Sequence, residues 1–222
     1  MRPENESSGQ PRSFIEEARR RQIIAAAVEV LADEGYGRAT LARIARQAGV
    51  SKGVISYHFD GKDELMRQVV IQLFVAGAEF MGPLLAEQKT AAGTLRTYIA
   101  TNLQFIQANQ RFLAAMIEVV PNLRNADGTP AFGPSDGEDA MVAPVRDILR
   151  SGQQSGEFGE FDPLVMARLI RDSIDGAAGH AARDPEFDID AHADQMVRMY
   201  LAAVQPAPPN STTTAQPEET DD

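Results

Sequence analysis

The chain has 222 residues, a formal net charge of -11, three histidines and no cysteine. This length is enough for one domain or two small ones with a real hydrophobic core. The lack of cysteine excludes disulfides, thiolate metal sites and cysteine nucleophiles, and three scattered histidines leave little for a histidine-built metal cage. The overall negative charge argues against indiscriminate coating of nucleic acids and against binding to anionic membranes.

The charge is unevenly distributed along the chain. Residues 1–62 carry 10 basic and 8 acidic side chains, whereas residues 63–222 carry 11 basic and 24 acidic ones. Such an asymmetry suggests two roles: a mildly cationic part that approaches phosphates and an acidic part that keeps the protein soluble. Because the N-terminus lacks the apolar run of a signal peptide and no stretch approaches 18 consecutive apolar residues, we predict a cytoplasmic protein without a membrane partner.

The apolar spacing is helical almost throughout and no convincing strand pattern occurs, so the predicted class is all-α with about nine helices. Residues 1–12 are expected to form a flexible arm, and residues 205–222 a low-complexity, disordered tail. The first helix is expected to begin at Phe14 and to end before Gly35. The remaining predicted helices cover about 41–48, 51–58, 62–87, 91–108, 110–121, 137–153, 162–182 and 188–204.

The most informative pattern consists of the two short helices that follow the first one. Thr40 and Ser51 are predicted N-caps of these helices, and Gly49 between them can adopt the positive φ that a tight turn needs. The small Ala45 lets the helices approach each other, and Ile55 supplies the apolar contact between them. This combined spacing favours a helix-turn-helix over the alternative, a structural helical hairpin.

The exposed face of the second short helix decides what such a motif would do. Lys52 places charge at the helix start, where a helix in the major groove contacts bases, and the Val54 methyls can meet a thymine methyl. Tyr57 and His58 can donate to phosphates, and Lys62 can form an anion site with the start of the next helix. The alternatives are that His58 is a packed or capping histidine and that Lys62 is a solvated helix-end charge.

Residues 14–65 resemble the DNA-binding domain of the tetracycline-repressor (TetR) family. The matching positions are the apolar first helix ending in Gly35-Tyr36, then Thr40, Ile44-Ala45, Ala48-Gly49-Val50-Ser51, Tyr57-His58-Phe59, and Lys62 with Glu64-Leu65. The form of residues 55–59 also resembles a subset that includes choline- and betaine-linked repressors. The positions aligned with the family's DNA contacts are Thr40, Lys52, Gly53, Val54, Ser56, Tyr57, His58 and Lys62.

The resemblance further implies a homodimer that binds a double-stranded DNA operator. A three-helix DNA-binding domain is expected at residues 13–61, and a larger helical ligand-binding and dimerisation domain at residues 62–204. In that picture the last two helices pair with their symmetry mates in a four-helix bundle. The candidate interface combines small residues with an apolar stripe: Ala177, Ala178, Ala181, Met196, Val197, Tyr200 and Leu201.

The central helices carry a stripe of aromatic and methionine side chains that could line a pocket for a small-molecule effector. Such stripes are also typical of plain core, so both interpretations stay open at this point. The candidate effector residues are Phe74, Phe80, Met81, Tyr98, Phe105, Phe112, Met116 and Met141.

The sequence therefore predicts a homodimeric repressor that a small apolar or amphipathic effector releases from a palindromic operator. The alternative is a helical ligand-binding or protein-interaction module without sequence-specific DNA binding. An enzyme is not expected, because no phosphate-binding loop, nucleophile elbow or set of nucleophile, base and orienting group is present. We also predict no cofactor and no metal, since Asp172, Asp175, His180 and His192 match no standard ligand spacing.

Overall fold

The computed structural model describes residues 14–132 and 141–206, and within them every regular element is an α-helix. The all-α prediction is therefore confirmed. The predicted arm and almost all of the predicted tail lie outside the described residues. The helices are α1 Phe14–Glu34, α2 Leu41–Ala48, α3 Lys52–His58, α4 Lys62–Ala86, α5 Ala91–Ala108, α6 Gln110–Val119, α7 Ala143–Ser155, α8 Pro163–Ala181 and α9 Ile189–Ala203.

Most helix boundaries lie within two residues of the predicted ones, because the sequence marks them with caps. Thr90 caps α5, Asp162 caps α8 and Asp188 caps α9, each through a side-chain oxygen that accepts from a backbone N–H in the first turn. The exception is α7, which begins at Ala143 with Pro144 in its first turn, and not at residue 137 as predicted. Residues 133–140 lie outside the described part of the chain.

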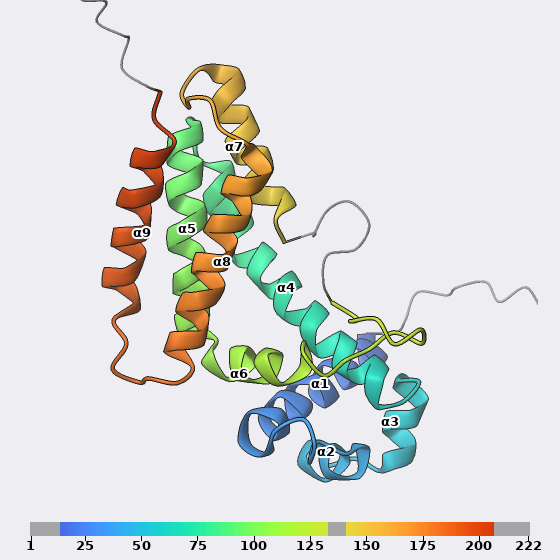
Figure 1. The fold of residues 1–222 in the computed structure, drawn as a ribbon. Coiled ribbons are helices and arrows are strands. Elements are labelled where there is room, and N and C mark those ends of the chain that lie inside the picture. Colours follow the sequence, from blue (N-terminus) through green and yellow to red (C-terminus); the bar gives the residue numbers. More distant parts are fainter. Residues whose placement is uncertain (1–13, 133–140, 207–222) are drawn as a thin grey trace, which may run out of the picture.

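Two hydrophobic clusters hold the described helices together. Figure 1 shows the helices that they join: α1, α2 and α3 at one end, α5, α7, α8 and α9 at the other, and α4 running between them. The first joins α1, α2 and α3 with the N-terminal half of α4, where Leu65, Met66, Val69 and Val70 are buried. It also includes buried residues of α6, whereas the second cluster joins α5, α7, α8 and α9. The proposed domain boundary at residue 61 thus falls inside a continuous core, and α4 and α6 link the small N-terminal unit to the larger helical body.

Helix α4 departs from one expectation. By length and composition alone it is long and apolar enough to cross a membrane, although its apolar residues are not consecutive. Core helices of globular proteins pass the same test. In this fold the N-terminal half of α4 contributes to the first hydrophobic cluster and α4 packs against α1, α5 and α6, while 22% of its most apolar window is buried.

Candidate nucleic-acid interface

Helices α2 and α3 form the helix-turn-helix that the sequence predicts, with the predicted caps. The Thr40 Oγ1 accepts from the Arg43 N–H at 3.2 Å and starts α2, and the Ser51 Oγ accepts from the Val54 N–H at 3.3 Å and starts α3. Between them Gly49 has a φ of 67°, a left-handed conformation that strains residues with a Cβ. The tight turn therefore depends on Gly49.

The two helices meet along the predicted apolar seam. Ile44, Ala45, Ala48 and Ile55 are all buried, and Ile44 and Ile55 are completely inaccessible. The Gln22 side chain of α1 donates to the Ala48 carbonyl at 2.7 Å, so α1 also satisfies the C-terminal end of α2. Burial of this seam fixes which side of α3 faces outward.

The outward face of α3 carries the predicted DNA-contacting side chains. Lys52, Gly53, Ser56 and Tyr57 are exposed, while Val54 and His58 are half-buried. Tyr57 is 74% exposed, an unusual placement for a large aromatic residue. The structure thus brings six of the eight predicted contacts together on one helix; the exposed Thr40 lies at the start of α2 and the half-buried Lys62 at the start of α4.

Arg20 of α1 holds the C-terminal end of α3, a role that no pattern in the sequence indicates. Its guanidinium is buried, donates to the His58 carbonyl and lies over the Phe59 ring at 4.2 Å from the centroid. It also pairs with Glu64 of α4 at 3.7 Å. One cation therefore satisfies a free carbonyl at the end of the helix and ties α1, α3 and α4 together.

Lys62 has an internal partner that the sequence did not reveal. Its ammonium donates to the Tyr36 carbonyl at 2.7 Å and lies 3.9 Å from the centre of the Tyr36 ring. Partial burial lowers the pKa of Lys62, against the opposing effect of the nearby Asp63 carboxylate. Lys62 thus fastens the start of α4 to the α1–α2 turn, in addition to the phosphate contact predicted for it.

A hollow of about 400 Å³ lies between the N-terminal end of α1 and helix α3. From α1 it is lined by Ile15, Glu16 and Arg19, which the sequence analysis did not include among the contact residues. Arg19 lies three positions after Glu16 and four after Ile15, so it shares a helix face with each of them, a signal that could have identified this side of α1. On the opposite side the hollow is lined by Ser51, Gly53, Val54, Tyr57 and His58.

The predicted effector residues do not line one common site in this structure. Phe80 and Phe105 lie with ring centroids 5.8 Å apart, beside Met81 and the buried Gly77, where α4 meets α5. The other five lie elsewhere. Phe74 and Phe112 pack on the first hydrophobic cluster, Met116 and the buried Tyr98 belong to the second, and Met141 adjoins the segment outside the described residues.

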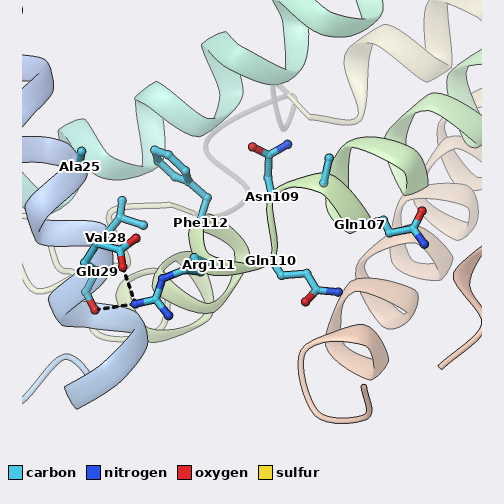
Figure 2. A pocket seen from close by; sticks show the side chains of 9 residues that line it. Ala25, Val28, Glu29, Gln107, Asn109, Gln110, Arg111 and Phe112 are labelled. Atoms are coloured by element: carbon cyan, nitrogen blue, oxygen red, sulfur yellow. Dashed lines mark hydrogen bonds and ion pairs between the residues drawn. The ribbon is translucent and has the colours of Figure 1, made fainter. Parts of the chain in front are cut away.

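A second hollow, of about 390 Å³, lies where α1 meets the turn between α5 and α6 (Figure 2). Phe112 is the one predicted effector residue that lines it. At its edge the Arg111 guanidinium of α6 pairs with Glu29 at 2.6 Å and with Asp33 at 2.9 Å, both on α1. The hydrogen bonds that Arg111 donates to these two carboxylates raise its pKa.

Five of the seven predicted interface residues are buried inside their own chain. Ala177, Ala178, Met196, Val197 and Tyr200 are between 1% and 6% exposed. The physical reason is that the apolar stripe of α9 packs against α5 of the same chain.

The remaining two predicted interface residues, Ala181 and Leu201, are partly buried against the same cluster. The surface of α8 and α9 that stays open is different. It presents three large apolar side chains that are each about half exposed: Val165, Leu169 and Met199.

Three of the four residues considered as metal ligands, Asp175, His180 and His192, have other partners. Arg171 donates to the Asp175 carboxylate at 3.1 and 2.5 Å, while His180 and His192 both lie against the Phe187 ring. Within residues 14–132 and 141–206, no group of three or more histidine, cysteine or acidic side chains could hold a metal ion.

Comparison with known proteins gives the same N-terminal unit. The model for bacterial regulatory proteins of the TetR family matches residues 23–69, which run from α1 into α4. The regulator BetI 1 of Chromohalobacter salexigens is 46% identical over 63 residues, which cover 28% of this chain and 31% of the relative. This match therefore spans only about a third of that relative.

Two further matches extend over most of the chain. The crystal structure of the regulator FadR from Bacillus subtilis with stearoyl-CoA has a TM-score of 0.69 at 23% identity, covering 83% of this chain and 99% of that one. The transcriptional repressor Rv1474c of Mycobacterium tuberculosis is 30% identical over 172 residues, covering 76% of this chain and 86% of the relative. With its helix-turn-helix and its helical body, this chain belongs to the TetR family of bacterial regulatory proteins.

Proposed function

We propose that this protein is a homodimeric repressor that places α3 of each subunit in the major groove of a palindromic operator. The observation that carries the proposal is the outward face of α3, where Lys52, Gly53 and Tyr57 are exposed on a helix whose other side is buried through Ile55. A rigidly held helix with small and hydrogen-bonding side chains at its start fits the base edges of the groove. The alternative of a module without DNA recognition leaves this exposed face unexplained.

The charge distribution favours sequence-selective over general DNA binding. The first 62 residues have two more basic than acidic side chains, and the rest of the chain is strongly acidic. The affinity of non-specific complexes comes mainly from the neutralisation of DNA phosphates by basic side chains. A reading unit with little net positive charge therefore gains little affinity from phosphate contacts. Base contacts by residues 52–57 would then supply a larger share of the affinity.

Dimerisation is assigned to the open faces of α8 and α9, two neighbouring helices that Figure 1 shows with α5 between them. Val165 and Leu169 are one helical turn apart on α8, and Met199 lies on α9. The half-exposed apolar side chains of this surface would be removed from water by the same surface of a second subunit across a two-fold axis. Such a dimer presents two reading helices to two operator half-sites.

The effector is assigned to the helical body, near the Phe80–Phe105 pair between α4 and α5. The aromatic and methionine side chains there suit an apolar or amphipathic molecule. The related B. subtilis regulator, which was solved with stearoyl-CoA, supports this class of ligand. The identity of the molecule is left to experiment.

Polar contacts give the body a route to the reading unit. The Glu118 carboxylate of α6 accepts from the Tyr36 N–H at 2.8 Å, and Lys62 of α4 donates to the carbonyl of the same residue at 2.7 Å. Arg111 adds its ion pairs from α6 to α1. If the effector shifts α4 or α6, the spacing of the two α3 helices changes, and a coupling of about 1–3 kcal/mol gives a roughly 5- to 150-fold loss of operator affinity.

Selection of genomic DNA fragments by the purified full-length protein tests the proposal. Recovered fragments should share a palindromic sequence, and a mobility shift should then separate them from unrelated DNA. If no fragment is enriched and the protein shows no sequence-selective binding at low salt, the repressor assignment is wrong and the alternative of a non-reading module stands.

A further inference from the structure

The Tyr57 phenol on the outward face of α3 is held by a carboxylate from another helix. Its hydroxyl donates to Glu16 Oε1 at 3.1 Å, across 41 residues of sequence. The ring is 74% exposed, so its orientation owes little to packing, although it also meets the His58 ring edge-on at a centroid distance of 5.0 Å. The contact to Glu16 therefore fixes a side chain that would otherwise sample several rotamers.

We propose that Glu16 is a positioning residue for operator recognition: by holding the Tyr57 hydroxyl it sets the ring for reading, while its charge weakens binding to any DNA. This inference rests on the proposed DNA-binding function and adds a residue of α1 to it. Glu16 and Tyr57 both line the hollow of about 400 Å³ that opens over Gly53 and Val54. The ring thus stands at the wall of the space that a base edge would enter.

Holding the ring in advance improves binding to the operator. Ordering a free side chain on binding lowers affinity, and a side chain that is already ordered avoids this loss, which is roughly 2- to 12-fold in Kd. The Tyr57 phenol carries its proton at neutral pH in any case, and the hydrogen bond to Glu16 raises its pKa further. This gain applies to the DNA whose bases fit the positioned ring and not to DNA in general.

The Glu16 charge acts on every DNA alike. It lies in the first turn of α1, at the rim of the same hollow, while Arg19 on this rim donates to the Gln22 side chain at 2.7 Å. A carboxylate about 8 Å from a phosphate in water lowers affinity roughly twofold, and added salt screens this effect. Positioning raises affinity for the operator alone and so increases the ratio of operator to background affinity, whereas the repulsion lowers both affinities and leaves their ratio unchanged.

The chain offers a matched control in Glu17, which lies in the same turn of α1 and is exposed. Glu16→Gln removes the charge but keeps an oxygen that can accept from Tyr57, and Glu16→Ala removes both. Tyr57→Phe removes the donor. Glu17→Gln removes one charge from the same turn without touching the hydrogen bond.

The experiment measures Kd of the full-length variants by fluorescence anisotropy, on the recovered operator and on a scrambled duplex, at two salt concentrations. Glu16→Gln and Glu17→Gln should both gain roughly twofold on the scrambled duplex at low salt. Glu16→Ala and Tyr57→Phe should each lose roughly 2- to 12-fold in the operator-to-scrambled ratio, and Glu16→Gln should lose less than Glu16→Ala. The Glu16→Ala/Tyr57→Phe double variant should lose less than the product of the two single losses.

Three results would overturn the inference while leaving the proposed function intact: equal ratios for Glu16→Ala and Glu17→Gln, losses that multiply in the double variant, or no loss for Tyr57→Phe. A wild-type protein that prefers no DNA fragment would instead overturn the proposed function itself. Thermal unfolding of each variant shows whether it folds, and if Glu16→Ala does not, the Glu16→Gln and Tyr57→Phe ratios decide the matter.

Discussion

The Gly53→Ala substitution separates the stability of the reading unit from its fit to DNA. Gly53 lies within α3, and its φ is not in the left-handed region. A Cβ built at this position meets only the Ser51 Oγ, at 3.7 Å, which is ordinary van der Waals contact. Alanine is therefore accommodated without strain, and it reduces the backbone entropy that glycine loses on folding.

The expected gain in the free energy of unfolding is about 0.5 kcal/mol, the lower end for a glycine-to-alanine change because the residue lies in the first turn. For a chain of this size that corresponds to a rise in Tm of about 1–2 °C. Operator binding should move the other way, because the new methyl group projects into the hollow where base edges approach. A loss of about 1–3 kcal/mol is expected, the scale of one mismatched base pair.

Thermal unfolding and a mobility shift on the recovered operator measure the two effects on the same sample. A stabilised variant that binds the operator 5- to 150-fold more weakly agrees with the argument. Undiminished operator affinity would show that Gly53 does not lie at a close approach to DNA. A fall in Tm would show that the backbone of α3 differs from the one described.

Three further predictions concern the body and its links. Leu169→Glu should raise the dissociation constant of the dimer about 100-fold, because two carboxylates that meet at the two-fold interface cost about 3 kcal/mol. The control Ile117→Glu changes another exposed apolar residue and should leave the dimer unchanged. Sedimentation of both variants checks this, and equal dissociation of the two variants would refute the interface. Glu118→Ala should lower the free energy of unfolding by about 1.5 kcal/mol through loss of its bond to a backbone N–H, and an unchanged denaturation midpoint would contradict that role. Hydrogen bonds from two backbone N–H groups at the start of α5 lower the pKa of Glu157, so its stabilising effect is present above its ordinary pKa of 4.5 and is lost as pH falls through the lowered value. The Tm difference between wild type and Glu157→Gln should therefore be largest at neutral pH and should disappear in acid. A Tm difference that does not depend on pH would argue against this link between the protonation of Glu157 and stability.

The helix-turn-helix could be predicted from sequence because its determinants are local. Thr40 and Ser51 cap backbone groups three residues away, and Gly49 supplies the turn within the same short segment. The outward face of α3 then follows from the burial of Ile44 and Ile55. Each of these features depends on neighbours within a few residues, which a pattern in the sequence can report.

The partners of the same residues could not be predicted, because they come from distant segments. Lys62 reads as a helix-end charge until the fold brings Tyr36 beside it, and Tyr57 reads as a DNA contact without its link to Glu16. Arg20 lies on the first helix and gives no sign that it holds the far end of α3. Long-range hydrogen bonds of this kind leave no periodic signal.

The interface and pocket residues stay predictions, and the sequence alone could not decide them for a related reason. A periodic apolar stripe indicates that one face of a helix is buried but not which element buries it. The apolar stripe of α9, which includes Met196 and Tyr200, packs on α5 of the same chain. The sequence pattern alone does not distinguish this packing within one subunit from packing against a second subunit. The aromatic residues of the central helices likewise divide between two clusters and a small group around Gly77.

The most direct test of the account is the ratio of two dissociation constants, measured at the same salt concentration, for a fragment recovered from genomic DNA and for its scrambled counterpart. The account predicts that the protein binds the recovered fragment as a dimer, at least about 1000-fold more tightly than the scrambled duplex, and protects two symmetric half-sites. A ratio near one, for a protein that is folded and dimeric, would contradict the claim that α3 reads a DNA sequence.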